Sequence, residues 1–336
     1  MLFTTGLVAA ILVAAVPSAG AARRAFDASP FLSFGRAFPS SGTDRLRPGA
    51  ERVIAEIRWR RTASAGVTVL VSPAYAADPS TGERWVAFFD SLIHGSELSR
   101  LTAYVASPAE IDRICPDALG CYDDDRMWIS DVANGGVSPQ EIAAHEYGHH
   151  VAFNRVNPPW IAVEWGTKRW ASAMNVCSRA LAGTAYPGDE GGFYTLNPGE
   201  AFAETYRVLN GYGVDDWRVA DPSFRPTQAA LAATRADVVD PWTGPVSQTI
   251  RVRFTHGRTW SGVVSTPLDG SLAVATTTGG VDLQLLSADR RTVLASGSWG
   301  PSGGKAVGYQ VCGRRAFVLR VTTSGPRRLT VRVTKP

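Results

Sequence analysis

The five residues His145-Glu146-Tyr147-Gly148-His149 place two imidazoles four positions apart, with a carboxylate beside the first. Residues four apart on a helix share a face, so His145 and His149 can direct both rings at one ion. Neutral imidazole is a good ligand for Zn²⁺, and the Glu146 carboxylate can reach a water activated by such an ion and act as a general base. The motif therefore indicates metal-assisted hydrolysis. The alternative is a buried helix whose histidines fall at this spacing without binding a metal.

Signals of helix initiation stand directly before the motif. The run Ser138-Pro139-Gln140-Glu141 offers an N-cap serine, a proline at the first helical position and a glutamate at the third. Gly148 costs about 1 kcal/mol inside a helix, which indicates that another backbone or side chain approaches closely there. We predict that a helix beginning after Ser138 carries both histidines.

A catalytic zinc site needs a third protein ligand and one open position. A third histidine in the extended form H-E-x-x-H-x-x-G-x-x-H is excluded, because Ala152 and Arg155 occupy the positions of its glycine and histidine. Apart from His150, which directly follows the motif, the only later histidine is His256, in the C-terminal part of the chain. The third ligand is therefore expected to be a carboxylate.

Two glutamates downstream have the spacing to share one helix face. Glu200 and Glu204 follow Asn197, and a helix beginning there would present both together. We predict that Glu200 binds the metal and that Glu204 accepts the second ring N–H of a metal ligand, His145 being the first choice. Two alternatives stay open: Glu200 serves only as the partner of Asn197 in a capping box, or Glu164 is the ligand instead.

These residues resemble the gluzincin metallopeptidases, and within them the anthrax lethal factor type of catalytic domain. The resemblance covers roughly residues 128–209. The matching residues are the motif at 145–149, Tyr194, Asn197 and Glu200-Ala201-Phe202-Ala203-Glu204. The resemblance implies that His145, His149 and Glu200 bind one Zn²⁺ and that Glu146 is the base.

The resemblance also implies two roles around the metal. Tyr194 would donate its hydroxyl to the developing oxyanion, with Tyr206 as the reserve. In zincins generally, an edge strand ahead of the active helix aligns the peptide substrate, and residues 126–130 occupy that place here.

The N-terminus has the pattern of a secretory signal. Residues 7–16 form an apolar run too short to span a bilayer, followed by Pro17 and small residues. We expect a signal peptide over 1–21, a secreted protein, and no membrane span, because no later apolar run has the required length. Residues 22–61 read as a leader or a pro-segment.

The four cysteines suit an exported chain, in which two disulfides can pair in three ways. Cys115 and Cys121 are close enough to close a small loop. That pairing leaves Cys177 and Cys312 to join the front of the chain to its back. Their spacings lack the paired form of cysteine zinc sites.

The remaining sequence divides the chain into two modules. Strands are expected at 67–71, 101–105 and 126–130, and a helix at 84–92, which with the motif helices give an α+β zincin-type metallopeptidase domain over 62–240. Asp123-Asp124-Asp125 reads as a solvated turn, with a calcium loop as the alternative.

From residue 249 onward apolar and polar residues alternate, so 245–336 is expected to be an all-β antiparallel sandwich. This part resembles the bacterial pre-peptidase C-terminal domain. It holds eleven Arg and two Lys against three Asp. An anionic cell-surface polymer is therefore a possible partner.

The sequence thus predicts a secreted zinc metallopeptidase acting on a peptide or protein substrate. The competing class is a non-catalytic extracellular binding protein with a structural zinc and a basic sandwich, and a third possibility is hydrolysis of a non-peptide amide. The net charge of +4 does not by itself imply nucleic acid, which we do not expect as a partner. The chain shows no phosphate-binding glycine loop, nucleophilic serine motif or redox cysteine pair.

Overall fold

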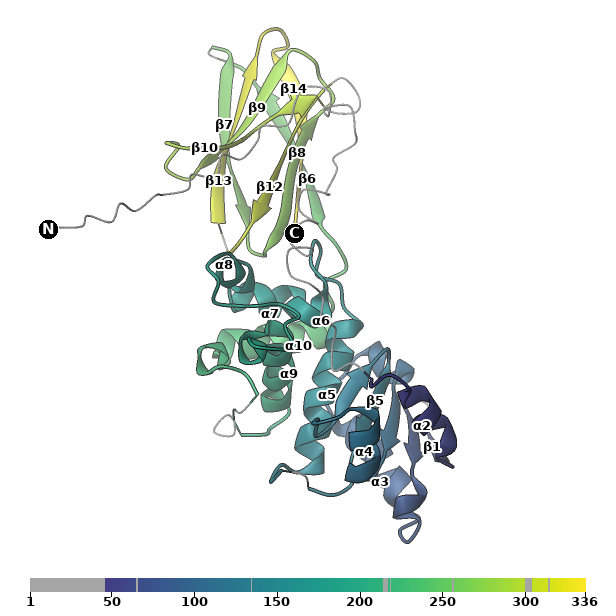
Figure 1. Ribbon diagram of the computed structural model, residues 1–336. Coiled ribbons are helices and arrows are strands. Elements are labelled where there is room, and N and C mark those ends of the chain that lie inside the picture. Colours follow the sequence, from purple (N-terminus) through teal and green to yellow (C-terminus); the bar gives the residue numbers. More distant parts are fainter. Residues whose placement is uncertain are drawn as a thin grey trace, which may run out of the picture.

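The computed structural model describes residues 46–64, 66–133, 135–213, 217, 219–255, 257–299, 304–313 and 315–336. Within them a module of helices and one sheet is followed by a module of antiparallel strands (Figure 1). This agrees with the expected α+β domain followed by an all-β domain. The expected signal peptide and residues 22–45 of the expected leader lie outside the described residues. No helix within the described ranges has the length and apolar character that a bilayer crossing requires.

The first module is built on a five-stranded sheet in the order β1-β2-β3-β5-β4. β2, β3 and β5 run parallel, while β1 and β4 lie antiparallel at the two edges. The strands are β1 (Arg60–Ala63), β2 (Thr68–Val71), β3 (Thr102–Val105), β4 (Cys121–Asp123) and β5 (Arg126–Ile129). The edge strand beside the helix that carries the motif is thus β4. The expectation that residues 126–130 form that edge is wrong, because β5 lies between β3 and β4.

Helices cover both faces of this sheet, as the alternation of its side chains requires. Val69, Ala103 and Met127 point into the main core, whereas Trp128 belongs to a smaller core on the opposite face. The main core includes buried residues of α3 (Thr81–Ser91) and α5 (Pro139–Phe153), and the smaller core those of α2 (Ala50–Glu56) and α4 (Pro108–Ile114).

The expected end of the leader at residue 61 falls inside β1. Arg60 and Arg61 pair with Val71 and Leu70 of β2, so β1 is part of the sheet. Ala50 and Ile54 of α2 are buried against the sheet as well. Residues from 46 onward therefore belong structurally to the first module.

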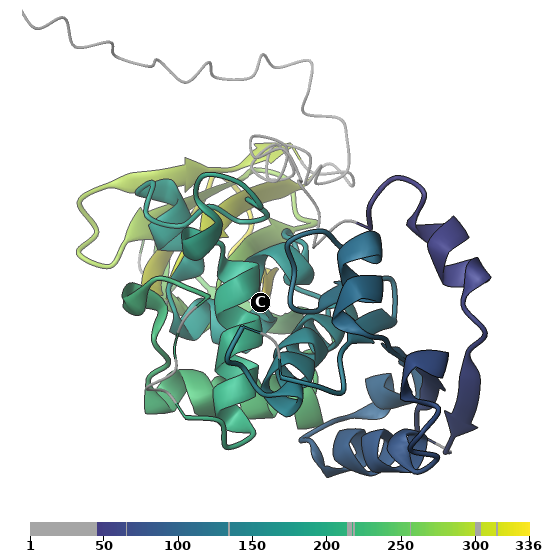
Figure 2. The ribbon, with the colours of Figure 1, turned by 60° about the horizontal axis from the view of Figure 1, so that its bottom comes forward.

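The second half of this module is helical. Its helices are α6 (Ala162–Trp165), α7 (Lys168–Ala173), α8 (Val176–Leu181), α9 (Pro198–Leu209) and α10 (Gln228–Val239). Short 3₁₀ turns are η2 (Pro73–Tyr75), η3 (Ser96–Arg100), η4 (Tyr194–Leu196) and η6 (Pro222–Phe224). α9 packs along α5, and α10 packs against α7 and α9. Figure 2 shows this division from another side, with the purple and blue sheet region next to the green helices.

The second module consists of two antiparallel sheets, in the orders β10-β9-β13-β7 and β11-β12-β8-β14-β6. The first contains β7 (Thr259–Thr266), β9 (Val281–Ser287), β10 (Val293–Ser296) and β13 (Arg315–Thr323). The second contains β6 (Val246–Arg253), β8 (Gly270–Thr276), β11 (Ser298–Trp299), β12 (Lys305–Val311) and β14 (Arg328–Lys335). Apolar residues of both sheets share one core. In a sandwich, the apolar residues of each alternating strand face inward and pack between the two sheets.

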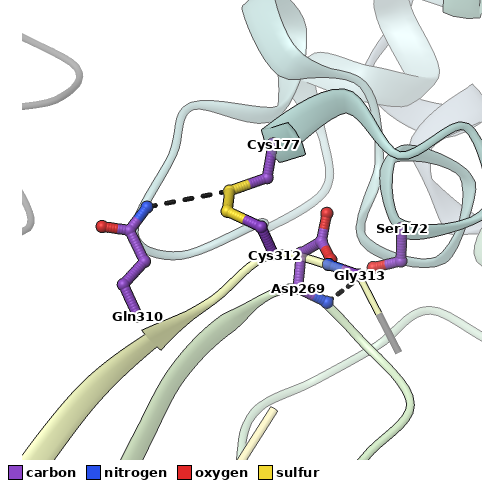
Figure 3. The surroundings of a disulfide bond; sticks show 6 residues. All are labelled: Ser172, Cys177, Asp269, Gln310, Cys312 and Gly313. Atoms are coloured by element: carbon purple, nitrogen blue, oxygen red, sulfur yellow. Dashed lines mark hydrogen bonds between the residues drawn. A yellow bond between two sulfur atoms is a disulfide. The ribbon is translucent and has the colours of Figure 1, made fainter. Parts of the chain in front are cut away.

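Both expected disulfides are present. Cys115–Cys121 joins the end of α4 to β4, and Cys177–Cys312 joins α8 to the residue after β12. The second bridge lies at the junction of the modules (Figure 3). There the Asp269 backbone N–H donates to Ser172 Oγ at 2.8 Å, which adds a direct hydrogen bond between the modules.

Candidate metal centre

The helix that carries the motif begins where the sequence predicts. Ser138 Oγ accepts from the Glu141 backbone N–H at 3.2 Å, and a Glu141 carboxylate oxygen accepts from the Ser138 N–H at 3.1 Å. This reciprocal pair satisfies two backbone donors at the start of α5. The motif lies in the buried middle of α5.

Gly148 is the point at which α5 and α9 touch. A Cβ atom at this position would lie 2.6 Å from the Cα of Ala203. The predicted close approach is thus confirmed, and the approaching segment is a helix backbone. Because Ala203 lies between Glu200 and Glu204, this contact holds both carboxylates against the histidine face of α5.

The structure brings His145, His149 and Glu200 together. His145 Nε2 lies 3.3 Å from His149 Nε2 and 3.3 Å from Glu200 Oε2, and His149 Nε2 lies 3.5 Å from Glu200 Oε1. All three side chains are buried. Ligand atoms about 2.0–2.1 Å from a tetrahedral ion are about 3.3–3.4 Å from one another. The donor atoms therefore have the spacing of three corners of a tetrahedral metal site.

The charges around the cluster favour a cation. Burial alone would lower the pKa of His145, but the Glu200 hydrogen bond and the charges of Glu204 and Glu200 raise it to about 9. Burial would raise the pKa of Glu200, but the charge of His149 and the hydrogen bond with His145 hold it far below the usual range. The carboxylates thus draw positive charge into a buried site, and a divalent ion would supply it.

Asn197 and Tyr194 position the Glu200 side chain beside the histidines. Asn197 Oδ1 accepts from the Gly199 N–H at 2.9 Å and caps α9. The Glu200 carboxylate lies with the histidines, where Tyr194 OH donates to its Oε2 at 2.8 Å. Glu200 is therefore more than a capping partner, and Tyr194, in η4, borders the cluster.

Glu204 lies behind His145, in an ion network that sequence reasoning missed. Its Oε1 is 3.8 Å from His145 Nδ1, and its Oε2 accepts from Arg207 Nε at 2.7 Å. Arg207 also donates to Glu141 Oε1 at 3.3 Å, which ties α9 to the start of α5. The sequence feature that could have indicated Arg207 is its i, i+3 spacing from Glu204, which allows an ion pair on one helix face.

The rival residues lie elsewhere. Glu164, on α6, packs beside the positions of Gly188 and Gly199 and is not part of the His–His–Glu cluster, and burial raises its pKa. Tyr206, the reserve donor, is buried and donates to the Ile93 carbonyl at 2.6 Å.

The aspartate triplet consists of Asp123, the last residue of β4, and of Asp124 and Asp125 in the turn to β5. Asp124 and Asp125 adopt the left-handed conformation, with φ of 46° and 63°. The Asp125 carboxylate accepts from Asn154 at 2.7 Å and lies 3.3 Å from the buried His150 ring. The triplet thus joins the hairpin to the end of α5, and His150, which sequence reasoning left unassigned, is its partner.

Comparison with known proteins offers no relative. No protein family model matches the sequence, and no curated protein matches it. The capsular polysaccharide assembling protein CapF from Staphylococcus aureus aligns over 47% of this chain and 48% of its own, at 10% identity and a TM-score of 0.15. This chain thus spans about half the length of CapF in that alignment. A second crystal form of CapF aligns over 79% and 81%, at 9% identity and a TM-score of 0.16. At these scores function must be argued from the site.

Proposed function

We propose that this chain is a secreted zinc-dependent peptidase with a zincin-type catalytic domain of the gluzincin class. One observation carries the proposal: two imidazole nitrogens and a carboxylate from two touching helices converge at 3.3–3.5 Å. Two nitrogen ligands and one carboxylate are a common ligand set of catalytic zinc, and they leave one position open. The two disulfides support an extracellular location.

The residues of the chain divide the work of peptide hydrolysis. Zn²⁺, held by His145, His149 and Glu200, would supply Lewis-acid polarisation of the scissile carbonyl and a lowered water pKa. Glu146 takes the proton from the attacking water and passes it to the leaving amine. Tyr194, whose hydroxyl already borders the cluster, donates to the developing oxyanion.

The sheet edge offers a place for an extended substrate. β4 is the last strand of the sheet and lies against α5. Gly120 precedes β4, and a Cβ atom there would lie 3.2 Å from Glu146 Oε1. The nearest atom to that Cβ would be Ile142 Cγ2, at 2.7 Å, so the glycine lets the start of β4 pack closely against α5 beside the base. A peptide that pairs with β4 would pass directly beside Glu146.

Metal content and cleavage, measured together, test the proposal. We expect wild type to hold about one zinc by elemental analysis and to cleave a denatured protein substrate. Glu146→Gln should keep the zinc and lose cleavage, while Glu200→Ala should lose both. Glu83→Gln, an exposed site on α3, is the matched control and should behave as wild type.

Three other outcomes would contradict the third ligand, the catalytic role or the need for metal. Zinc retained by Glu200→Ala and lost by Glu164→Ala would move the third ligand to Glu164. Zinc without any cleavage of proteins or peptides would favour a structural metal in a binding protein. A chelator should abolish cleavage and added Zn²⁺ should restore it; cleavage that persists without metal would overturn the mechanism.

A further inference from the structure

The outer face of β6 and β14 presents a compact set of arginines and threonines. Six residues of the two strands that face away from the sandwich core are exposed, and we call them the arginine–threonine face: Thr249, Arg251, Arg253, Arg328, Thr330 and Arg332. They are cross-strand partners, Arg253 with Arg328, Arg251 with Thr330 and Thr249 with Arg332. Residues between them, such as Val252 and Val331, point into the core.

This face carries charge that the module itself does not balance. Like charges directly opposite each other, as in Arg253 and Arg328, destabilise a sheet. The three aspartates of the module are engaged elsewhere: Asp269 accepts from the Gly313 N–H at the junction, Asp282 lies 3.7 Å from Lys305 Nζ, and Asp289 accepts from Ser287. Among the described residues, none forms an ion pair with the four arginines of the face.

The arginines also surround a hollow. A depression of about 360 Å³ is lined by Arg251, Arg253, Arg328 and Thr330, together with Val252 and Leu329. Guanidinium groups bind carboxylate, sulfate and phosphate oxygens in a two-pronged geometry. Threonine hydroxyls between them can donate to or accept from hydroxyl groups. The face thus offers alternating partners for acid groups and for hydroxyl groups.

We propose that the arginine–threonine face binds an acidic polysaccharide, a polymer that carries both acid groups and sugar hydroxyls. Its six positions include no aromatic side chain on which nucleic acid bases would stack, and no apolar side chain that would enter a bilayer. The face lies on the sandwich, whereas the metal centre lies between α5 and α9 of the other module (Figure 1). Binding therefore holds the proposed peptidase at a glycan surface without using its catalytic residues.

A charge-matched pair of variants of the full chain tests this proposal. Arg251→Gln/Arg253→Gln/Arg328→Gln removes three charges from the face. Arg235→Gln/Arg290→Gln/Arg291→Gln removes three exposed charges from α10 and the turn after β9. Affinity for heparin, for polygalacturonate and for neutral dextran is measured over a salt series, with thermal unfolding as the folding check.

We expect wild type to bind both acidic glycans and not dextran. The face variant should lose at least about tenfold in affinity and show a shallower salt dependence, because fewer counterions are released. The control variant should stay within about twofold of wild type. Glu146→Gln should bind as wild type does, so this result is independent of peptidase activity.

Three results would overturn the proposal. Equal losses in both triple variants would show that only net charge matters. Unchanged binding in the face variant would show that these arginines do not form the binding site. Tighter binding to a short DNA duplex or to anionic phospholipid vesicles than to the glycans would identify another class of ligand.

Discussion

Tyr194 is the side chain at the metal centre whose role is most open to direct measurement. Its hydroxyl donates to Glu200 and lies at the border of the buried cluster. If it stabilises the oxyanion, Tyr194→Phe should lower kcat by about 10²–10³ with little change in KM. Zinc content should stay as in wild type, because Glu200 keeps both histidines as neighbours.

A neighbouring tyrosine provides the control for this change. Tyr186 stacks on Phe193 at 4.0 Å in the segment before α9, and Tyr186→Phe keeps that ring. It should leave kcat unchanged. Equal kcat for the two variants would remove Tyr194 from the proposed mechanism.

The members of the candidate metal cluster were predictable because helix periodicity determines which side chains share a face. His145 and His149 are related by one helical turn, as are Glu200 and Glu204, so their pairing needed no tertiary information. The spacing of Glu200 and Glu204 favoured Glu200, but the sequence left Glu164 open as the alternative. The position of Glu200 beside the histidines depends on the contact between α5 and α9, which the sequence does not reveal.

At the scale of elements, Gly148 sets the distance between α5 and α9. Alanine would normally gain about 1 kcal/mol over glycine inside a helix, but overpacking costs about 1–3 kcal/mol. The added Cβ would meet the Ala203 backbone, which cannot rotate aside. We expect Gly148→Ala to lower Tm and to weaken zinc binding by at least about tenfold in chelator competition, because Glu200 moves with α9.

A glycine in open space is the control for this substitution. A Cβ atom on Gly192 would meet nothing within 4 Å. Gly192→Ala should therefore leave zinc affinity and Tm as they are in wild type. Wild-type zinc affinity in Gly148→Ala would show that the helix contact does not position the ligands.

Three strands of the first sheet were predictable as elements, whereas β1, β4 and the order of the strands in the sheet were not. β2, β3 and β5 appear as apolar runs bounded by turn residues. β4 has only three residues, too few for an alternating pattern to show, and it pairs through a turn that requires left-handed Asp124 and Asp125. Sequence patterns thus located β5 but assigned the edge to the wrong strand.

At the scale of the whole molecule, Lys168 is buried at the junction of the modules. Its Nζ donates to the Pro158 carbonyl at 2.8 Å and lies 4.9 Å from the Trp242 ring. Burial lowers the pKa of Lys168 to about 7, although the negative charges of Asp269 and Asp237 act to raise it. The unfolded chain therefore binds more protons at this group between about pH 7 and the ordinary lysine value of 10.5.

The sign of this difference gives a pH prediction. The contribution of Lys168 to the free energy of unfolding rises with pH through that window, by at most about 1.4 kcal/mol per pH unit. We expect urea unfolding at pH 7–9 to show a steeper rise for wild type than for Lys168→Met. Lys335→Met, which removes a lysine at the end of β14, should keep the wild-type slope. Parallel slopes in wild type and Lys168→Met would contradict the burial argument.

The Cys177–Cys312 bridge changes what a break in the main chain would do. The stretch 240–245, between α10 and β6, is mostly exposed and is a natural place for a proteolytic nick. A nick there would produce two fragments that stay covalently joined, because the bridge spans the break. Such a protein would run as one band on a gel without reductant and as two with it. The sandwich and whatever it binds would therefore remain tethered to the metal centre until the disulfide is reduced.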